Sequence, residues 1–340
     1  MLHRLVRPVC AAALAAALTG CFNSAEPVAE ITGLTMGSTY SIKWVGREGT
    51  PPAAEVQATV EQLLEDFESV ASTWRPDSDL SRFNAAPAGT CQDMPEPILD
   101  LVVLAQQLHQ HSDGSFDLTL EPLMRLWGFH GAGEPRQLPE PGQLAEAMAR
   151  TGHEHLHIRG QQLCKDNQLE LDVSGIAAGY MVDEVAERLI AMGIKDYMVE
   201  LTGELKADGE KPGGSPWRIA VEEPRDESRV AQLVLPLRGY GVSTSGDYRN
   251  YFEHEGQRYS HTFDPVSGKP VMHDLAAVTV LHESAAWADG LSTTLLVMGS
   301  ERGWEYALEH DLPALFVIRQ GDGFVSRSTP RFIALQEGKE

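Results

Sequence analysis

A histidine in a short polar segment is the first candidate for chemistry. Residues 259–270 read YSHTFDPVSGKP and hold His261 together with a turn at Ser267 and Gly268. Such a turn needs its small residues but not the imidazole. The pKa of histidine lies near neutrality, which suits a general base. His261 is therefore either a catalytic base or an ordinary hairpin residue.

A second candidate is a set of oxygen-bearing side chains at helical spacing. Residues 287–296 read WADGLSTTLL and place Asp289, Ser292 and Thr293 at positions i, i+3 and i+4, on one face of a helix. One carboxylate and two hydroxyls suit a hard cation such as Mg²⁺. The simpler explanation is an aspartate near a helix N-terminus followed by buried hydroxyls.

Two further segments could hold a phosphate or line a site. Residues 169–183, LELDVSGIAAGYMVD, are predicted to form a strand, a Ser-Gly turn and the start of a helix. Free backbone N–H groups and the helix dipole favour phosphate at such a junction, and small residues allow close approach. Residues 114–129, GSFDLTLEPLMRLWGF, place Asp117 between two apolar residues, either in a turn or at a site.

The string HEHLH at residues 153–157 matches a zinc-protease motif, which works only on a helix. Here a glycine precedes it, and His and apolar residues alternate up to Gly160. This alternation predicts a half-exposed strand and not a zinc site.

The elements around these residues follow clear patterns. Apolar residues at helical spacing predict helices over 55–72, 95–112, 141–152, 176–193, 284–299 and 301–310. Strands are predicted over 30–46, 153–160, 168–173, 196–201, 217–223, 231–237, 240–245, 276–282 and 312–319, with a hairpin over 251–264 that turns at Glu255 and Gly256. The order predicts an α+β fold of helices on largely antiparallel sheets, forming a single catalytic unit.

The N-terminus reads as a targeting segment. Residues 1–20 combine two arginines with an Ala/Leu core, and LTGC at 18–21 is the lipobox pattern of bacterial lipoproteins. We expect cleavage before Cys21, lipid on its sulfur, a tether over 21–30 and a domain over 31–340. The alternative is an ordinary secretory signal. The expected location is the periplasmic face of a bacterial membrane, inner or outer, where Cys91 and Cys164 either pair or stay free.

The overall charge limits the partners. Lys and Arg number 27 against 49 Asp and Glu, which gives a formal net charge of −22. A chain this acidic repels nucleic acid, so we expect no nucleic-acid partner. A phosphate-bearing substrate would need a cation or backbone N–H donors at its site.

Taken together, the order and wording of these motifs identify a family. The chain resembles the FAD:protein FMN transferases of the ApbE family from about Ile31 to the C-terminus. The matching segments are TMGSTY, STWRPDSDLSRFN, GSFDLTLEPLMRLWGF, LDVSGIAAGYMVD, VSTSGDYRNYF with RYSHTFDPVSGKP, and ADGLSTTLLVMG. The resemblance implies Mg²⁺-assisted transfer of the FMN part of FAD to a Thr or Ser hydroxyl of an acceptor protein, with release of AMP.

The resemblance also implies roles for single residues. His261 would take the proton from the acceptor hydroxyl. The carbonyl of Gly175 would hold Mg²⁺ together with Asp289, Ser292 and Thr293. The residues that would contact or line the FAD site are Met36, Trp74, Ser115, Phe116, Asp117, Asp172, Ala178 and Phe263.

Three positions depart from the family pattern. Ala178 stands where Lys or Glu is common, so a polar contact to FAD is missing. Ser292 stands where some members have Asp, which predicts weaker Mg²⁺ binding. Thr202-Gly203 replaces a common Gly-Gly pair.

The family implies exported acceptors, either flavoprotein subunits of membrane redox complexes or flavin-dependent reductases. Two alternatives remain at this point. One is a metal-dependent FAD pyrophosphatase that uses water and gives FMN and AMP. The other is a flavin-binding lipoprotein without catalysis.

Overall fold

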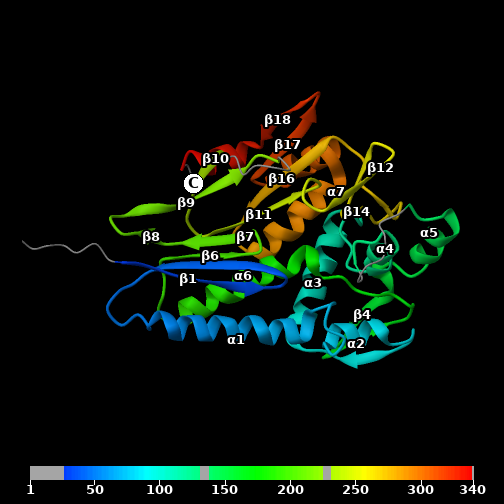
Figure 1. The fold of residues 1–340 in the computed structure, drawn as a ribbon, viewed down its shortest axis with the longest axis horizontal. Helices are drawn as coiled ribbons and strands as arrows, with labels where there is room; N and C mark the ends of the chain where they lie inside the picture. Colours follow the sequence, from blue (N-terminus) through cyan, green and yellow to red (C-terminus); the bar gives the residue numbers. More distant parts are fainter. Residues whose placement is uncertain (1–26, 131–137, 225–230, 339–340) are drawn as a thin grey trace, which may run out of the picture.

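The computed structural model describes residues 27–130, 138–224 and 231–338, and a long antiparallel sheet lies at its centre (Figure 1). Eight strands follow the order β1-β2-β6-β7-β11-β16-β17-β18. Their bounds are β1 Val28–Thr35, β2 Ser38–Val45, β6 Tyr197–Leu201, β7 Glu204–Asp208, β11 Tyr240–Gly246, β16 Leu275–His282, β17 Ala314–Gln320 and β18 Gly323–Ser328. Every neighbouring pair is antiparallel, so the expected α+β class is confirmed.

Both faces of this sheet are buried, as β16 shows. Val278 and Val280 belong to one core cluster, whereas Ala277 and Leu281 belong to another. Successive side chains of a strand point to opposite faces, so the sheet separates two cores. The strand is accordingly apolar throughout, LAAVTVLH, and does not alternate with polar residues.

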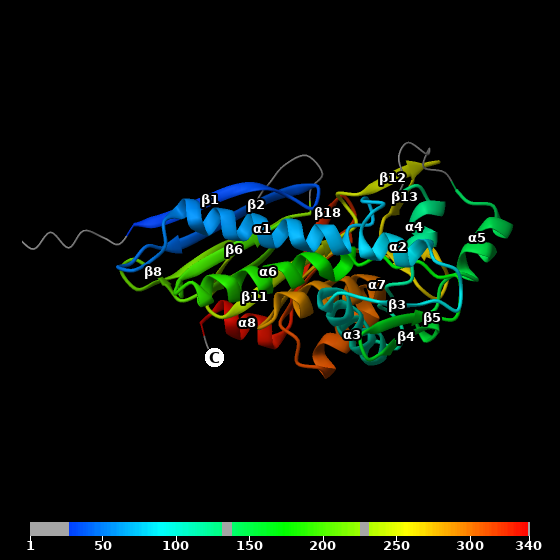
Figure 2. The ribbon, with the colours of Figure 1, turned by 90° about the horizontal axis from the view of Figure 1, so that it is seen from below.

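Three long helices cover one face of the sheet, and a fourth, α3 Glu96–His111, packs against these helices (Figure 2). The three are α1 Ala53–Ala71, α6 Ser174–Ala191 and α7 Ala285–Glu309. In α1 the buried residues include Val56, Val60, Leu64 and Phe67, which recur at the spacing of one helix face. Helix α7 changes direction at Gly299, whose φ of 83° is non-helical, at the point where the sequence predicted one helix to end.

A smaller layer covers the other face. It consists of β8 Glu210–Lys211, β9 Ser215–Glu222, β10 Ala231–Leu237 and α8 Pro330–Gln336. Trp217 of β9, Leu235 of β10 and Phe332 of α8 pack there against the sheet. The expected strands over 217–223 and 231–237 therefore exist, but they form a separate sheet.

Short elements gather beyond one end of the main sheet (Figure 1). They are α2 Asp79–Ala85, β3 Cys91–Asp93, α4 Glu121–Leu126, α5 Pro141–Met148, a 3₁₀ turn His153–His155, β4 Leu156–Arg159, β5 Gln162–Lys165, and the hairpins β12 Tyr251–His254 with β13 Gln257–Ser260 and β14 Phe263–Asp264 with β15 Lys269–Pro270. The predicted turn at Glu255-Gly256 lies between β12 and β13, where both residues have positive φ.

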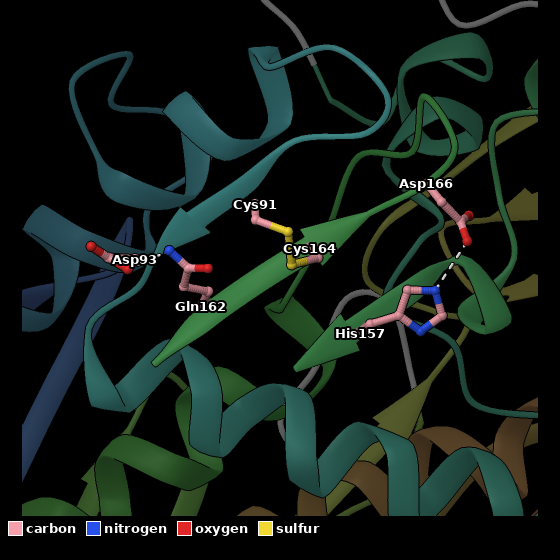
Figure 3. Close-up of a disulfide and its surroundings, with 6 residues drawn as sticks. All are labelled: Cys91, Asp93, His157, Gln162, Cys164 and Asp166. Carbon is pink, nitrogen blue, oxygen red and sulfur yellow. Dashed lines mark hydrogen bonds and ion pairs between the residues drawn. A yellow bond between two sulfur atoms is a disulfide. The ribbon is translucent and has the colours of Figure 1, made fainter. Parts of the chain in front are cut away.

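A disulfide joins two strands of this region. Cys91 of β3 and Cys164 of β5 are direct partners in the ladder and are bonded to each other (Figure 3). The pairing that the sequence left open is therefore present. The bond closes a loop with a sequence separation of 73 residues, and it ties α3 and the segment after it to one small sheet.

Three strand predictions need correction. Residues 30–46 form a hairpin and not one strand, because Met36 and Gly37 adopt positive φ between β1 and β2. Residues 168–173 form no strand, because the main chain there bonds elsewhere: the N–H of Leu171 donates to the side chain of Asn84.

The predicted strand over 153–160 begins only at Leu156. The N–H of His155 donates to the carbonyl of Gly152, which closes a 3₁₀ turn over the first part of the HEHLH string. The side chains of His155 and His157 both contact Asp166, and Figure 3 shows the second of these contacts.

The predictions for the N-terminus fall mostly outside the described residues. The leader over 1–20 and Cys21 are among them, as is most of the tether over 21–30, whereas β1 begins at Val28. No helix within the described ranges combines the length and apolar character needed to cross a bilayer.

Candidate active site

A cavity of about 470 Å³ opens where the end of the main sheet meets the short elements. Ten of the residues singled out from the sequence line it: Trp74, Ser115, Phe116, Asp117, Asp172, Gly175, His261, Phe263, Asp289 and Thr293. They come from segments far apart in the chain. The fold therefore brings motifs that are far apart in the sequence into one cavity.

Helix α7 and strand β11 supply the oxygen-rich wall of the cavity. Asp289 is 5% exposed, and its carboxylate accepts the N–H of Gly179 at 3.0 Å and the hydroxyl of Ser243 at 3.4 Å. One turn further, the hydroxyls of Thr293 and Ser245 lie 3.1 Å apart. The predicted helix face thus meets a row of β11 serines, so oxygen atoms surround this corner.

Close packing of two helices fixes the position of Asp289. Gly179 of α6 lies against α7 so tightly that an added Cβ would sit 2.4 Å from the carbonyl oxygen of Ala285 and 2.7 Å from the Cβ of Asp289. Only a glycine permits this approach, which lets its N–H reach the carboxylate. The small residues that suggested a ligand site in the sequence therefore also serve helix–helix contact.

Sequence reasoning missed Glu204, a second carboxylate in this corner. Glu204 is the first residue of β7 and follows the tight turn at Thr202 and Gly203, where Thr202 has a φ of 57°. The hydroxyl of Thr202 donates to its carboxylate at 2.8 Å. The positive φ of a non-glycine residue marks this turn in the structure. The sequence had pointed only to the neighbouring Thr202-Gly203 pair, as a departure from the family pattern, and not to Glu204.

The two carboxylates share an environment that disfavours negative charge. Burial, and then the charge of Glu204, raise the pKa of Asp289 well above its usual value. Burial also raises the pKa of Glu204. Among the described residues, no Lys or Arg side chain forms an ion pair with either group. A buried carboxylate, Asp289, and a half-buried one, Glu204, without a Lys or Arg partner in the described part of the chain and with hydroxyls beside them, fit a hard divalent cation.

His261 lies across the cavity, between β13 and β14. Its Nδ1 is 3.1 Å from the carbonyl oxygen of Asn250, and its main-chain N–H donates to the same oxygen. A carbonyl oxygen only accepts, so Nδ1 carries the hydrogen of the neutral ring. The basic nitrogen is then Nε2, which is the arrangement that proton abstraction requires.

The loop after α3 forms another wall. The carboxylate of Asp117 accepts both the N–H and the hydroxyl of Thr119 at 2.7 Å, which makes it a turn residue as well as a lining residue. Arg302 of α7 donates to the hydroxyl of Ser115 at 2.9 Å, and Nδ1 of His109 lies 2.9 Å from the carbonyl oxygen of Phe116. These contacts fix the loop from behind.

Asp172 lies beside a second polar group. Its carboxylate accepts the N–H and hydroxyl of Ser174, both at 2.9 Å, and burial raises its pKa. Ligand atoms of Glu121, His130 and Asp172 lie within 4.8 Å of one another. Nδ1 of His130 contacts Glu121 at 2.5 Å, and Arg125 donates to Glu121 at 2.7 Å. This group is therefore already internally paired.

The charge state of His130 follows from these neighbours. Burial lowers its pKa, but the hydrogen bond to Glu121 and the charge of Asp172 outweigh burial and raise the pKa above the ordinary value. Glu121 and Asp172 favour the protonated ring of His130, and protonation competes with metal binding at its nitrogens, so Asp289 and Thr293 fit a cation better.

Aromatic side chains line the mouth and the floor. Trp74 is 67% exposed, and its ring centroid lies 5.5 Å from that of His130. Phe263 is buried and meets Phe129 edge to face at 5.8 Å. An exposed indole at a cavity mouth can stack on a planar ring system.

Three of the expected residues do not line the cavity. Met36 lies in the β1–β2 turn, where its N–H donates to Glu68 at 2.7 Å. Ala178 is buried in α6. Ser292 is fully buried beneath the cavity wall, where its hydroxyl donates to the carbonyl of Asp289 and contacts Ser245 at 2.8 Å. Ser292 thus supports the wall from behind.

Comparisons with known proteins identify the family of this chain. The sequence profile of the ApbE family matches residues 36–316. A protein from Vibrio cholerae serotype O1 named FAD:protein FMN transferase is 41% identical over 316 residues, which cover 93% of this chain and 94% of that protein.

Solved structures are similar over the same length. The apo form of the flavinyl transferase ApbE from Pseudomonas stutzeri has 52% sequence identity and a TM-score of 0.87, covering 92% of this chain and 98% of its own. The flavin transferase ApbE from Vibrio cholerae has 39% identity and a TM-score of 0.85, covering 91% and 100%. The chain therefore belongs to the ApbE family.

Proposed function

We propose that this protein is an FAD:protein FMN transferase: it moves the FMN part of FAD to a Thr or Ser hydroxyl of an acceptor protein and releases AMP, with Mg²⁺ as the required cation. The names of its relatives support the FMN transfer. The observation that carries the proposal is one cavity with Asp289 and Thr293 on one wall and His261 on another.

The residues then take distinct parts. Asp289 and Thr293, with the carbonyl of Gly175, would hold Mg²⁺. A Cβ on Gly175 would lie 3.7 Å from the Cγ2 of Thr293, so these two positions are adjacent. When bound, Mg²⁺ supplies charge neutralisation for the diphosphate. The aromatic and loop residues of the cavity would bind the flavin and adenine ends.

The tautomer of His261 determines which ring nitrogen takes the proton of the acceptor hydroxyl. Nε2 accepts the proton of the acceptor hydroxyl while Nδ1–H stays bonded to the carbonyl of Asn250. The acceptor oxygen forms a bond to the phosphorus of the FMN phosphate, and the bond from that phosphorus to the bridging oxygen breaks. AMP takes the bridging oxygen and the electron pair of that bond. Positioning and charge stabilisation dominate reactions of this kind.

We further propose that the enzyme works at the periplasmic face of a bacterial membrane, anchored by lipid on Cys21. The lipobox pattern supports the anchor. The Cys91–Cys164 bond supports an oxidising compartment, where disulfides persist. The acceptors would then be exported flavoprotein subunits of membrane redox complexes or flavin-dependent reductases.

One assay tests the reaction. The purified protein is mixed with FAD, Mg²⁺ and the soluble domain of an exported redox subunit, and the products are run on a denaturing gel. Flavin fluorescence that stays with the acceptor supports the proposal. Free FMN and AMP with an unlabelled acceptor would show a pyrophosphatase. Unchanged FAD would show a binding protein without catalysis.

A further inference from the structure

A second hollow adjoins the cavity and is not explained by the binding of FAD. It measures about 370 Å³ and shares four lining residues with the cavity: Glu204, Thr244, Tyr248 and Arg249. These shared lining residues place the two spaces side by side. We call this hollow the β9 groove, because Ile219–Glu222 of β9 form one of its sides.

The opposite side of the β9 groove belongs to the main sheet. Ser38 and Thr39 begin β2, Glu200 lies near the end of β6, and Leu205 lies in β7. The lining is rich in polar groups, unlike a core cavity. One end of the groove reaches Tyr248 and Arg249, the two residues before Asn250, whose carbonyl oxygen contacts His261.

Strand β9 carries an open edge along this groove. Residues Trp217–Glu222 pair with β10 on one side. On the other side β8 reaches only Ser215 and Pro216. Within the described ranges, no strand pairs with Ile219, Ala220 or Val221 on that side. An unpaired strand edge offers N–H and C=O groups that an extended peptide can use.

We propose that the β9 groove binds the acceptor protein as an extended segment, which adds to the open edge of β9 and delivers its Thr or Ser hydroxyl into the cavity. This inference rests on the proposed function, since it names where the second substrate of that reaction enters. The reaction needs two substrates, and the groove is a second polar space that lies directly beside the first.

Strand geometry gives the segment a register. Side chains of a strand alternate between faces, so a hydroxyl residue that points toward Thr244 and Glu204 places its neighbours two positions away on the same face, in the groove. The immediate neighbours point outward. Hydrogen bonds to the main chain of β9 require only that the segment is accessible and extended. The residues shared by the groove and the cavity then accept a Thr or Ser side chain at one position of that segment.

The test compares two tryptophan substitutions on paired strands. Ala220 of β9 is exposed and lines the groove; its ladder partner Val234 of β10 is 50% exposed and is not among the lining residues. The probe is the acceptor domain used for the transfer assay. Ala220→Trp should raise the KM for the acceptor domain about tenfold or more and leave the Kd for FAD within about twofold of the wild-type value. Val234→Trp should change neither.

Two outcomes would contradict acceptor binding in the β9 groove while leaving the proposed function intact. The Ala220→Trp variant could keep the acceptor KM of the wild type, or it could lose FAD affinity in proportion to its loss of transfer. A wild type that labels no acceptor removes the proposed function itself, and the groove with it.

A synthetic peptide copied from the labelled segment tests strand addition directly. Main-chain N-methylation at successive positions should reduce labelling at every second residue, because alternate N–H groups of a strand face the same neighbour. Equal labelling of all the methylated peptides would contradict binding to the edge of β9.

Discussion

At the residue scale, the proposed reaction depends on His261 as a base held in one tautomer. Its Nδ1 faces the carbonyl oxygen of Asn250, and this contact leaves Nε2 as the basic nitrogen. Asn250 follows Tyr248 and Arg249, which line the β9 groove, so His261 contacts the residue next to that lining. A structural role and a catalytic role can therefore be separated by measuring binding and transfer independently.

His261→Ala should lower the rate of FMN transfer by about 10²–10⁴-fold, the range that general bases contribute, while FAD affinity stays close to wild type. Single-turnover labelling and fluorescence titration of FAD measure the two quantities. His254→Ala, in the exposed part of the same hairpin, is the matched control and should behave as wild type. Equal losses of binding and transfer in His261→Ala would make this histidine structural.

The raised pKa of Asp289 predicts how stability depends on pH. The protonated form is favoured in the folded protein, so the contribution of this group is fully present below its ordinary pKa of 3.8 and is lost as pH rises through the folded value. Without divalent cations, Asp289→Asn should therefore have a higher Tm than wild type at pH 8 and the same Tm near pH 4.

Adding Mg²⁺ at pH 8 should raise the Tm of the wild type and not that of Asp289→Asn. Thermal unfolding at both pH values, with EDTA or with Mg²⁺, measures this. An equal response of both proteins to Mg²⁺ would show that the cation binds elsewhere.

Part of this site can be predicted from residue types and their spacing in the sequence. Residue type and spacing made Asp289, Thr293 and His261 candidates with ordinary structural alternatives, and the resemblance to the family gave them their expected roles. Glu204 is not such a candidate, since Thr202-Gly203-Glu204 reads as an ordinary hairpin turn, and only the fold brings Glu204 into the cavity that Thr244 and Asp289 also line. Met36 and Ala178 carried an expected FAD contact, but the fold places neither on the cavity wall.

At the element scale, the contact between α6 and α7 sets the geometry of the cavity. Gly179 allows the two helices to touch, and its N–H bonds to Asp289. The helices themselves were predictable from apolar spacing. The lack of a strand over 168–173 was not, because a side chain of α2, Asn84, takes the hydrogen bond that a ladder would use.

Gly179→Ala should destabilise the protein by about 1–3 kcal/mol or more, because the new methyl group would overlap the carbonyl of Ala285. Gly142→Ala, in α5, is the control: nothing lies within 4 Å of the added Cβ, and alanine favours the helix. Urea unfolding of both variants measures the difference. Similar stability of Gly179→Ala and Gly142→Ala would show that α6 and α7 can move apart at little cost in free energy.

The disulfide acts on the small sheet beyond the end of the main one. Replacing Cys91 and Cys164 together by serine should lower the free energy of unfolding by about 4 kcal/mol, the chain-entropy value for a loop of 73 residues. Denaturation with and without a reductant measures this. The wild type should lose stability on reduction and the double variant should not, and a wild type indifferent to reductant would contradict the prediction.

At the scale of the whole molecule, a very acidic chain is proposed to handle an anionic substrate. The net charge of −22 opposes a diphosphate in general, so attraction must be local. The structure offers two polar corners in one cavity. Asp289 and Thr293 form one, and His130 and Asp172 form the other, with the buried Glu121 behind them. We assign the cation to the first, since the second is already paired internally.

Diffraction from crystals soaked in FAD and Mn²⁺, collected at the manganese edge, tests this assignment most directly. We expect an anomalous peak at about 2.0–2.4 Å from oxygen atoms of Asp289 and Thr293, with the diphosphate of FAD as a further ligand. A peak among Glu121, His130 and Asp172, with none beside Asp289, would contradict it.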